Sequence, residues 1–310
     1  MFPKHEKWLR PEEKTYFILL ISKNWLRPDE NSISDGYYKR IGFGLHYHSL
    51  NGESIEMAVW ATTDLISQAK GSAYIELKKT KVVCSVFDPR EIIIYFSTLG
   101  QIFCEVKFAP FSCPRKRRPH APDSEEKALS VALRKALEPT VCRHKFPNFQ
   151  IDVFVYILEH DGSCLAAAIN AAGLALADAA VPMYDIITAS SLAVIDNKVF
   201  VDPSEAEEYL ATMNSNNEAN HGVITMSMLP ELKQIADFRQ IGSMDVDCVT
   251  NAMEVLEKEC EKIVPNIQQV IVLNVMRTFK LQKKLDEEAR ERETALNEKM
   301  EEWKALLNSG

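Results

Sequence analysis

The pattern of apolar and polar positions is clearest between residues 151 and 177. Every second residue from 151 to 157 is Ile or Val, and the residues between them are mostly apolar too, as in a strand that is covered on both faces. Asp161 and Gly162 then indicate a turn. From residue 164 to 177 the side chains are small and apolar except for Asn170, which predicts a helix surrounded by other elements. A turn that leads into a helix can hold an anion on its backbone N–H groups, so this turn is the first candidate for chemistry.

Similar patterns predict further elements on both sides of this unit. Strands are expected at residues 73–77, 81–87, 92–96, 102–108, 186–195, 199–201, 223–229 and 232–237. Asp123 stands three residues before Glu126, which is the spacing of a capping box and predicts a helix that ends before Pro139. Further helices are expected at 204–210 and from 244 onward. The order of strands and helices favours a mixed sheet.

The two ends of the chain differ from its middle. The motif WLRP occurs twice within the first 56 residues, which is too few copies for a solenoid. After Lys280 the sequence is dense in Lys, Arg and Glu without a sustained heptad seam, so a single charged helix that could dock on a partner is favoured over a coiled coil. We therefore expect an N-terminal extension over residues 1–56, a folded domain over 57–264 and a charged helical tail over 265–310.

The composition excludes several classes of protein. The 310 residues are 46% hydrophobic, which is enough for a packed core. The net charge of −8 gives the chain no general affinity for nucleic acid, so contact with RNA must come from a local basic cluster. The chain starts with charged and aromatic residues and has no apolar run of about eighteen residues, which predicts an intracellular protein without a membrane segment.

The cysteine and histidine pattern indicates neither a disulfide framework nor a metal site. The seven cysteines are scattered, odd in number and without a CxxC pair. His46 and His48 stand two residues apart on an expected strand, but no third ligand follows at a suitable spacing. We expect neither a metal nor another cofactor.

A basic cluster occupies a proline-rich segment between residues 109 and 123. Four prolines keep this segment out of regular structure, and four cations stand in its middle: Arg115, Lys116, Arg117 and Arg118. Such clusters are most often solvated surface charge. They also attract phosphates, and this is the one local basic field that an acidic chain of this kind offers to RNA.

Six motifs occur in the order and spacing of the RNase PH family, which the chain resembles from residue 67 to 264. They are SQAKGSAYIE, TKVVCSV, RKRRPH, LRKALEP, DGSCLAAAINAAGLALADAAVPMYD and VDPSEAEE. Within the family the chain is most similar to the subunits of the six-membered ring of the eukaryotic RNA exosome, in particular the mRNA-transport-regulator type. The resemblance implies an α+β fold of the RNase PH type, like domain 2 of ribosomal protein S5: a single domain of mixed sheets packed with helices, here followed by the charged C-terminal helix.

The resemblance also implies where a site should lie. Active members use inorganic phosphate to cleave RNA from its 3′ end, with arginines on the phosphate and an acid that transfers a proton. Gly162 and Ser163 keep the backbone donors of the phosphate turn, but Leu165 stands where the family has an arginine. Val223 replaces the family's acid, and Asp202 matches an earlier aspartate but reads as a turn or capping residue. The phosphate turn and the acid site therefore both look degenerate.

Three functions can be ranked on this basis. The favoured one is a non-catalytic structural subunit of the exosome ring, working with 3′–5′ RNA processing and degradation in the nucleus, nucleolus and cytoplasm. Its partners would be other RNase PH-like subunits of a heterohexamer, S1/KH-type cap subunits and RNA, with residues 115–118 at the pore. The alternative is an active phosphate-dependent 3′–5′ exoribonuclease with Asp202 as its acid. A small-molecule-binding α/β protein is less attractive because no Gly-rich nucleotide loop is present.

Overall fold

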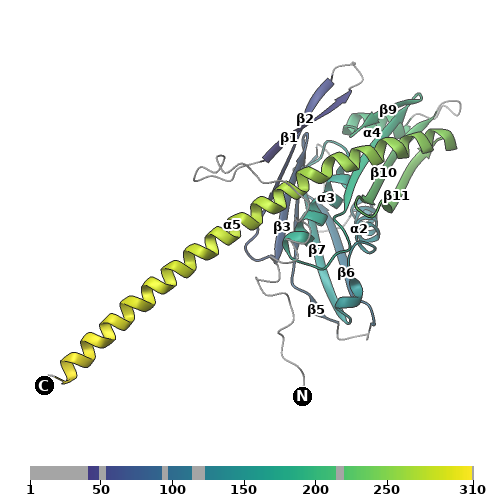
Figure 1. The fold of residues 1–310 in the computed structure, drawn as a ribbon. Helices are drawn as coiled ribbons and strands as arrows, with labels where there is room; N and C mark the ends of the chain where they lie inside the picture. Colours follow the sequence, from purple (N-terminus) through teal and green to yellow (C-terminus); the bar gives the residue numbers. More distant parts are fainter. Residues whose placement is uncertain (1–40, 49–53, 93–96, 114–122, 214–219, 309–310) are drawn as a thin grey trace.

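Two β-sheets lie on either side of the helix α3 (Cys164–Asp178), and the long helix α5 (Val246–Asn308) runs across both (Figure 1). The computed structural model describes residues 41–48, 54–92, 97–113, 123–213 and 220–308. All but the first two residues of α3 and its last two are buried almost completely, and the helix contacts strands of both sheets. The predicted buried helix is therefore confirmed, and it forms the centre of the structure.

The larger sheet has seven strands in the order β1-β2-β3-β4-β7-β5, with β6 also paired to β7. Its strands are β1 (Ile41–His48), β2 (Ser54–Thr63), β3 (Gly71–Leu77), β4 (Thr80–Val86), β5 (Arg90–Glu91), β6 (Gln101–Phe108) and β7 (Phe149–Glu159). β6 and β7 are parallel and the other pairs are antiparallel, so the sheet is mixed as predicted. The crossover between the two parallel strands carries the helix α2 (Ser124–Leu137) and a short 3₁₀ helix at Arg143–Lys145.

The smaller sheet is antiparallel and has the strand order β11-β10-β8-β9. Its strands are β8 (Thr188–Ile195), β9 (Lys198–Val201), β10 (His221–Leu229) and β11 (Gln234–Ser243), and α4 (Glu205–Met213) follows β9. Asp196 and Asn197 join β8 to β9 with φ angles of 51° and 63°. Two positive φ angles are what a two-residue type I′ hairpin requires, which confirms the predicted turn.

The N-terminal part of the sheet did not show in the sequence pattern. β1 and β2 form an antiparallel hairpin, and the boundary expected after residue 56 falls inside β2. The sequence of β1, IGFGLHYH, mixes glycines and histidines with apolar residues, which obscured its character as a strand. Both copies of WLRP lie outside the described residues, as does most of the strand expected at 92–96.

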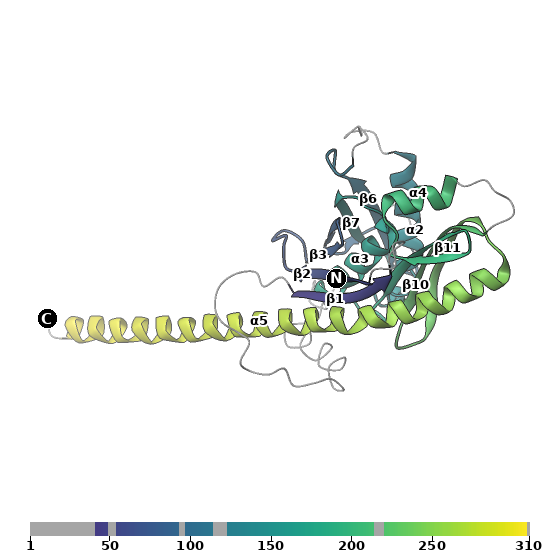
Figure 2. The same ribbon diagram turned by 90° about the horizontal axis from the view of Figure 1, so that it is seen from above.

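The helix α5 starts as part of the core and ends far from it. Leu256, Cys260, Ile263 and Ile267 are buried against the two sheets, so the helix contributes to the core on both sides of Pro265. Figure 2 shows the second half leaving the body as a straight projection. The charged tail is thus a continuation of a core helix, and none of the described helices is apolar over a length that could cross a bilayer.

One buried polar contact fixes α3 to the smaller sheet. The Asn170 side chain donates from Nδ2 to the carbonyl oxygen of Ala189 at 2.9 Å, and its Oδ1 accepts from the Ala189 N–H at 2.8 Å. Asn170 is 2% exposed, so water does not compete for these groups. The one polar residue in the buried part of the helix therefore satisfies both backbone groups of one residue at the start of β8.

We expect Asn170→Ala to lower the free energy of unfolding by about 2–4 kcal/mol, because it leaves a buried N–H and a buried C=O without this partner. Chemical denaturation of the full chain measures the change. Thr250→Ala, at an exposed position of α5, is the matched control and should change stability by less than about 0.5 kcal/mol. An Asn170→Ala variant as stable as the control would show that the contact has no energetic role.

Candidate functional site

The turn between β7 and α3 is held in place by β4. The Thr80 Oγ1 donates to the Gly162 carbonyl oxygen at 2.8 Å and accepts from the Asp161 N–H at 3.0 Å. Gly162 and Ser163 both have positive φ angles, 91° and 50°. Two hydrogen bonds to one side chain and two consecutive positive φ angles therefore define the conformation of the turn.

The start of α4 packs directly on this turn. A Cβ at Gly162 would lie 2.2 Å from the carbonyl oxygen of Pro203, so only glycine allows the approach. One turn further along α4, the carboxylate of Glu208 accepts the Ser163 N–H at 2.7 Å. The backbone donor at the start of α3, where an anion would bind, is thus engaged by a carboxylate of the same chain.

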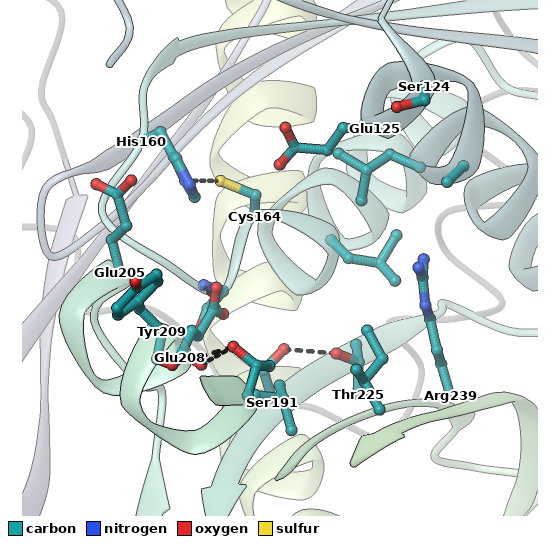
Figure 3. Close-up of a pocket in the computed structure, with 17 residues that line it drawn as sticks. Ser124, Glu125, His160, Cys164, Ser191, Glu205, Glu208, Tyr209, Thr225 and Arg239 are labelled. Atoms are coloured by element: carbon teal, nitrogen blue, oxygen red, sulfur yellow. Dashed lines mark hydrogen bonds between the residues drawn. The ribbon is translucent and has the colours of Figure 1, made fainter. Parts of the chain in front are cut away.

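A cleft of about 510 Å³ opens beside the turn (Figure 3). Its lining includes Ser163, which precedes α3, Leu165 from α3 and Val223 from β10. The structure therefore brings together positions that the sequence assigned to a phosphate turn and to an acid site. Leu165 and Val223 are both nearly buried, so they give the cleft an apolar wall where the resemblance implied charged groups.

The charged groups of the cleft are mainly acidic. Glu125 comes from α2, Glu205 and Glu208 come from α4, and Arg239 from β11 is the cation among the lining residues that the structure describes. The potential in the cleft is therefore unfavourable for a multiply charged anion such as phosphate.

Burial raises the pKa of the Glu208 carboxyl to about 7. The hydrogen bond from the Ser163 N–H lowers the pKa, whereas the nearby carboxylates of Glu205, Glu125 and Asp161 raise it. At neutral pH this group is therefore divided between its charged and neutral forms.

Asp202 is not among the described residues that line the cleft. It is buried in the turn between β9 and α4 with a φ of 49°, where its carbonyl oxygen accepts a hydrogen bond from the Lys78 ammonium. Burial raises the pKa of its carboxyl to about 6, with Lys78 lowering it and Glu259 raising it. The first turn of α4 is capped by another pair, since the Ser204 N–H donates to the Glu207 carboxylate at 2.8 Å. Asp202 is therefore a turn residue, and the first turn of α4 is capped by Ser204 and Glu207.

The remaining predicted positions give less information. The basic residues Arg115, Lys116, Arg117 and Arg118 lie outside the described part of the chain. His46 and His48 belong to β1, and the structure describes the backbone of that strand but not its side chains. Among the described residues, no three His, Cys, Asp or Glu side chains are grouped as a metal site requires.

Two important lining residues were missed at the level of sequence. Glu208 belongs to the motif VDPSEAEE, and the helical spacing from Ser204 was a usable signal that it faces back toward the turn. Arg239 gave no signal, because it reaches the cleft only through the pairing of β11 with β10, where it lies opposite Thr225.

Comparison with known proteins identifies the family. Residues 58–182 match the model of RNase PH, described as "3′ exoribonuclease family, domain 1". The mouse exosome complex component MTR3 is 34% identical over 232 residues, which cover 69% of this chain and 82% of that protein. The chain belongs to the RNase PH family.

Two further similar proteins agree with this assignment. The exosome complex component Rrp41 of Thermococcus kodakarensis is 36% identical over 185 residues, covering 59% of this chain and 71% of that protein. A solved structure of the Archaeoglobus fulgidus exosome with RNA bound to the active site matches with a TM-score of 0.57 at 19% identity, covering 83% of this chain and 98% of that one. At that identity the structural match supports the RNase PH fold alone, and it confirms the predicted fold class.

The raised pKa of Glu208 predicts how stability depends on pH. A carboxyl whose pKa is higher in the folded state binds more protons there than in the unfolded chain, so its contribution is present below the ordinary value of 4.5 and is lost as the pH rises through about 7. We expect Glu208→Gln to abolish this pH-dependent loss of stability. Between pH 5 and pH 8 the free energy of unfolding of the variant should rise by about 1–2 kcal/mol relative to that of the wild type, after allowance for solvent screening. Denaturation of both proteins across this range measures it, and parallel stability curves would contradict the assignment.

Proposed function

We propose that this chain is a non-catalytic structural subunit of an RNA exosome ring. The similarity to the MTR3 component of the mouse exosome, over most of both chains, supports the ring assignment. The observation that carries the non-catalytic part is the engaged turn, where the Glu208 carboxylate accepts the Ser163 N–H at 2.7 Å. Leu165, beside it, fills the position where the resemblance implies an arginine.

The cleft opposes each requirement of phosphorolysis. Phosphate carries between one and two negative charges at neutral pH, and to bind at the turn it would have to displace Glu208 and remain beside Glu125 and Glu205. Arginine normally offsets such charge with two parallel hydrogen bonds, which Leu165 cannot supply. Val223 offers no proton where the resemblance implies an acid. We infer that the fold has been kept in this chain while the reaction has been lost.

The ring role implies a set of partners. We propose that the sheet edges pair with other RNase PH-like subunits in a heterohexamer, that S1/KH-type subunits cap the ring, and that RNA passes through it. In this role the chain would support 3′–5′ processing and degradation of RNA in the nucleus, nucleolus and cytoplasm. Residues 115–118 are our proposed contact with RNA.

One feature of the cleft favours the alternative of an active phosphate-dependent exoribonuclease. Arg239 supplies a cation and Glu208 supplies a carboxyl whose pKa of about 7 suits proton transfer at neutral pH. This alternative places the acid at Glu208 rather than at Asp202, which lies outside the lining of the cleft. Activity measurements separate the two functions.

We expect the purified chain to release no nucleoside diphosphates from single-stranded RNA in the presence of magnesium and phosphate. The missing arginine and the missing acid each cost roughly a hundredfold or more in rate. Glu208→Gln and Asp202→Asn are the variants to run in parallel. Release at an ordinary enzymatic rate that Glu208→Gln abolishes would establish the exoribonuclease and refute the structural role.

The basic cluster should affect RNA binding by the assembled ring but not assembly. We expect the quadruple change of Arg115, Lys116, Arg117 and Arg118 to Glu to weaken RNA binding and to flatten its salt dependence, because fewer counterions are released from the phosphates. Binding titrations at several salt concentrations measure both effects, and the size of the complex is the control. A mutant ring of normal size with unchanged affinity and salt slope would show that the cluster is solvated surface charge.

A further inference from the structure

The cleft contains a pair of groups that phosphorolysis does not use. Cys164 is the first residue of α3 and His160 directly follows β7, and the imidazole Nδ1 lies 2.6 Å from the thiol sulfur (Figure 3). Both side chains line the cleft. A thiol and its potential base are therefore in contact at a cavity that small molecules can enter.

Three features of this position favour a nucleophilic sulfur. The thiolate is the reactive form of cysteine, and an adjacent imidazole can accept the thiol proton and remain beside the sulfur as a cation. The amino end of the fifteen-residue helix α3 adds the positive end of its dipole. The cavity supplies access, which a cysteine within the packed core lacks.

The other six cysteines provide an internal contrast. Burial raises the pKa of five of them, to about 12 for Cys104 and Cys260 and in the same direction for Cys84, Cys142 and Cys248. Their thiols are thus kept protonated. The sixth, Cys113, is half-buried and its sulfur accepts a hydrogen bond from the Ser112 hydroxyl at 3.8 Å, so it serves as the reference thiol outside the cleft.

The surroundings restrict what can react with Cys164. Cys164 is 7% exposed, so only a small molecule can reach its sulfur. Glu125, Glu205 and Glu208 line the same cleft and disfavour anions. The reagent class that fits is a small uncharged electrophile.

We propose that Cys164 is a site of covalent thiol modification, activated by His160, that reacts with small uncharged electrophiles and is oxidised by hydrogen peroxide. The thiolate sulfur attacks one peroxide oxygen, and the S–O bond forms as the O–O bond breaks. Sulfur loses two electrons and the peroxide is reduced. The departing hydroxide takes the proton from the His160 imidazolium, which yields water, a cysteine sulfenic acid and neutral His160. This proposal is independent of the ring assignment, since the reaction involves neither RNA nor another subunit.

The first test compares thiols within the same full-length protein. We expect iodoacetamide at neutral pH to alkylate Cys164 about tenfold faster than Cys113. A thiol without a nearby base is only a few per cent thiolate at this pH, so a base increases the reactive fraction. The increase in rate is smaller than the increase in thiolate, because a less basic thiolate is a weaker nucleophile. Mass spectrometry of each cysteine over time gives the rates, and Cys164→Ser confirms the assignment. His160→Gln should slow Cys164 to the rate of Cys113 and leave Cys113 unchanged. Equal rates at the two cysteines in the wild type would overturn the proposal.

The second test varies the charge of the reagent, and its first comparison uses the wild-type protein alone. We expect the ratio of the iodoacetate rate to the iodoacetamide rate to be several-fold lower at Cys164 than at Cys113, because the carboxylates of the cleft repel the anionic reagent. Glu205→Gln, at an exposed residue, should raise this ratio at Cys164 alone. Prior treatment with hydrogen peroxide should block alkylation of Cys164 first. The same ratio of rates at both cysteines would refute the proposed selectivity. So would a hydrogen peroxide treatment that blocks alkylation of Cys164 no faster than alkylation of Cys113.

Discussion

The close packing of α3 between the two sheets is the constraint on which the rest of the structure depends. The helix consists largely of alanine, and β3 comes so near its end that a Cβ at Gly71 would lie 2.3 Å from the Ala179 nitrogen. A helix with larger side chains would hold the sheets apart. Because the core on both sides is formed against this one helix, the turn that precedes α3 has little freedom. The site therefore inherits its geometry from the packing of the core.

The cleft shows how a backbone turn that could bind an anion can be given different chemistry. Gly162 brings α4 against the turn, and this approach places the Glu208 carboxylate on the Ser163 N–H. A backbone donor at the start of a helix needs an anionic partner or water, and a carboxylate of the same chain supplies it without loss of translational freedom. A free phosphate would have to compete with a partner that is always present. The engaged turn is thus a stable state of the protein.

The sequence was sufficient for the centre of the fold and insufficient for its edges. The strand β7, the helix α3 and the Asp196-Asn197 turn follow from strong local patterns that tertiary packing reinforces. β11 has a mixed pattern because its residues are exposed or half-buried, and β1 mixes glycines and histidines with apolar residues, so only the structure showed the pairing of these strands. For the site, Leu165 and Val223 were found at one cleft as the resemblance implied. Arg239 could not be found, since its position depends on strand pairing across the smaller sheet.

The distribution of charge constrains what this chain can do to RNA. An acidic cleft with an apolar wall repels a phosphodiester, because three carboxylates line it and Arg239 is the one cation among the lining residues that the structure describes. A nuclease needs cations and a proton-transferring group at one point, since the cations must hold the phosphate that is attacked. A subunit that only guides RNA needs its cations along the path and gains from a cleft that does not retain the strand. The charge of this cleft is therefore unsuited to holding the phosphodiester of an RNA strand, whichever path the strand takes.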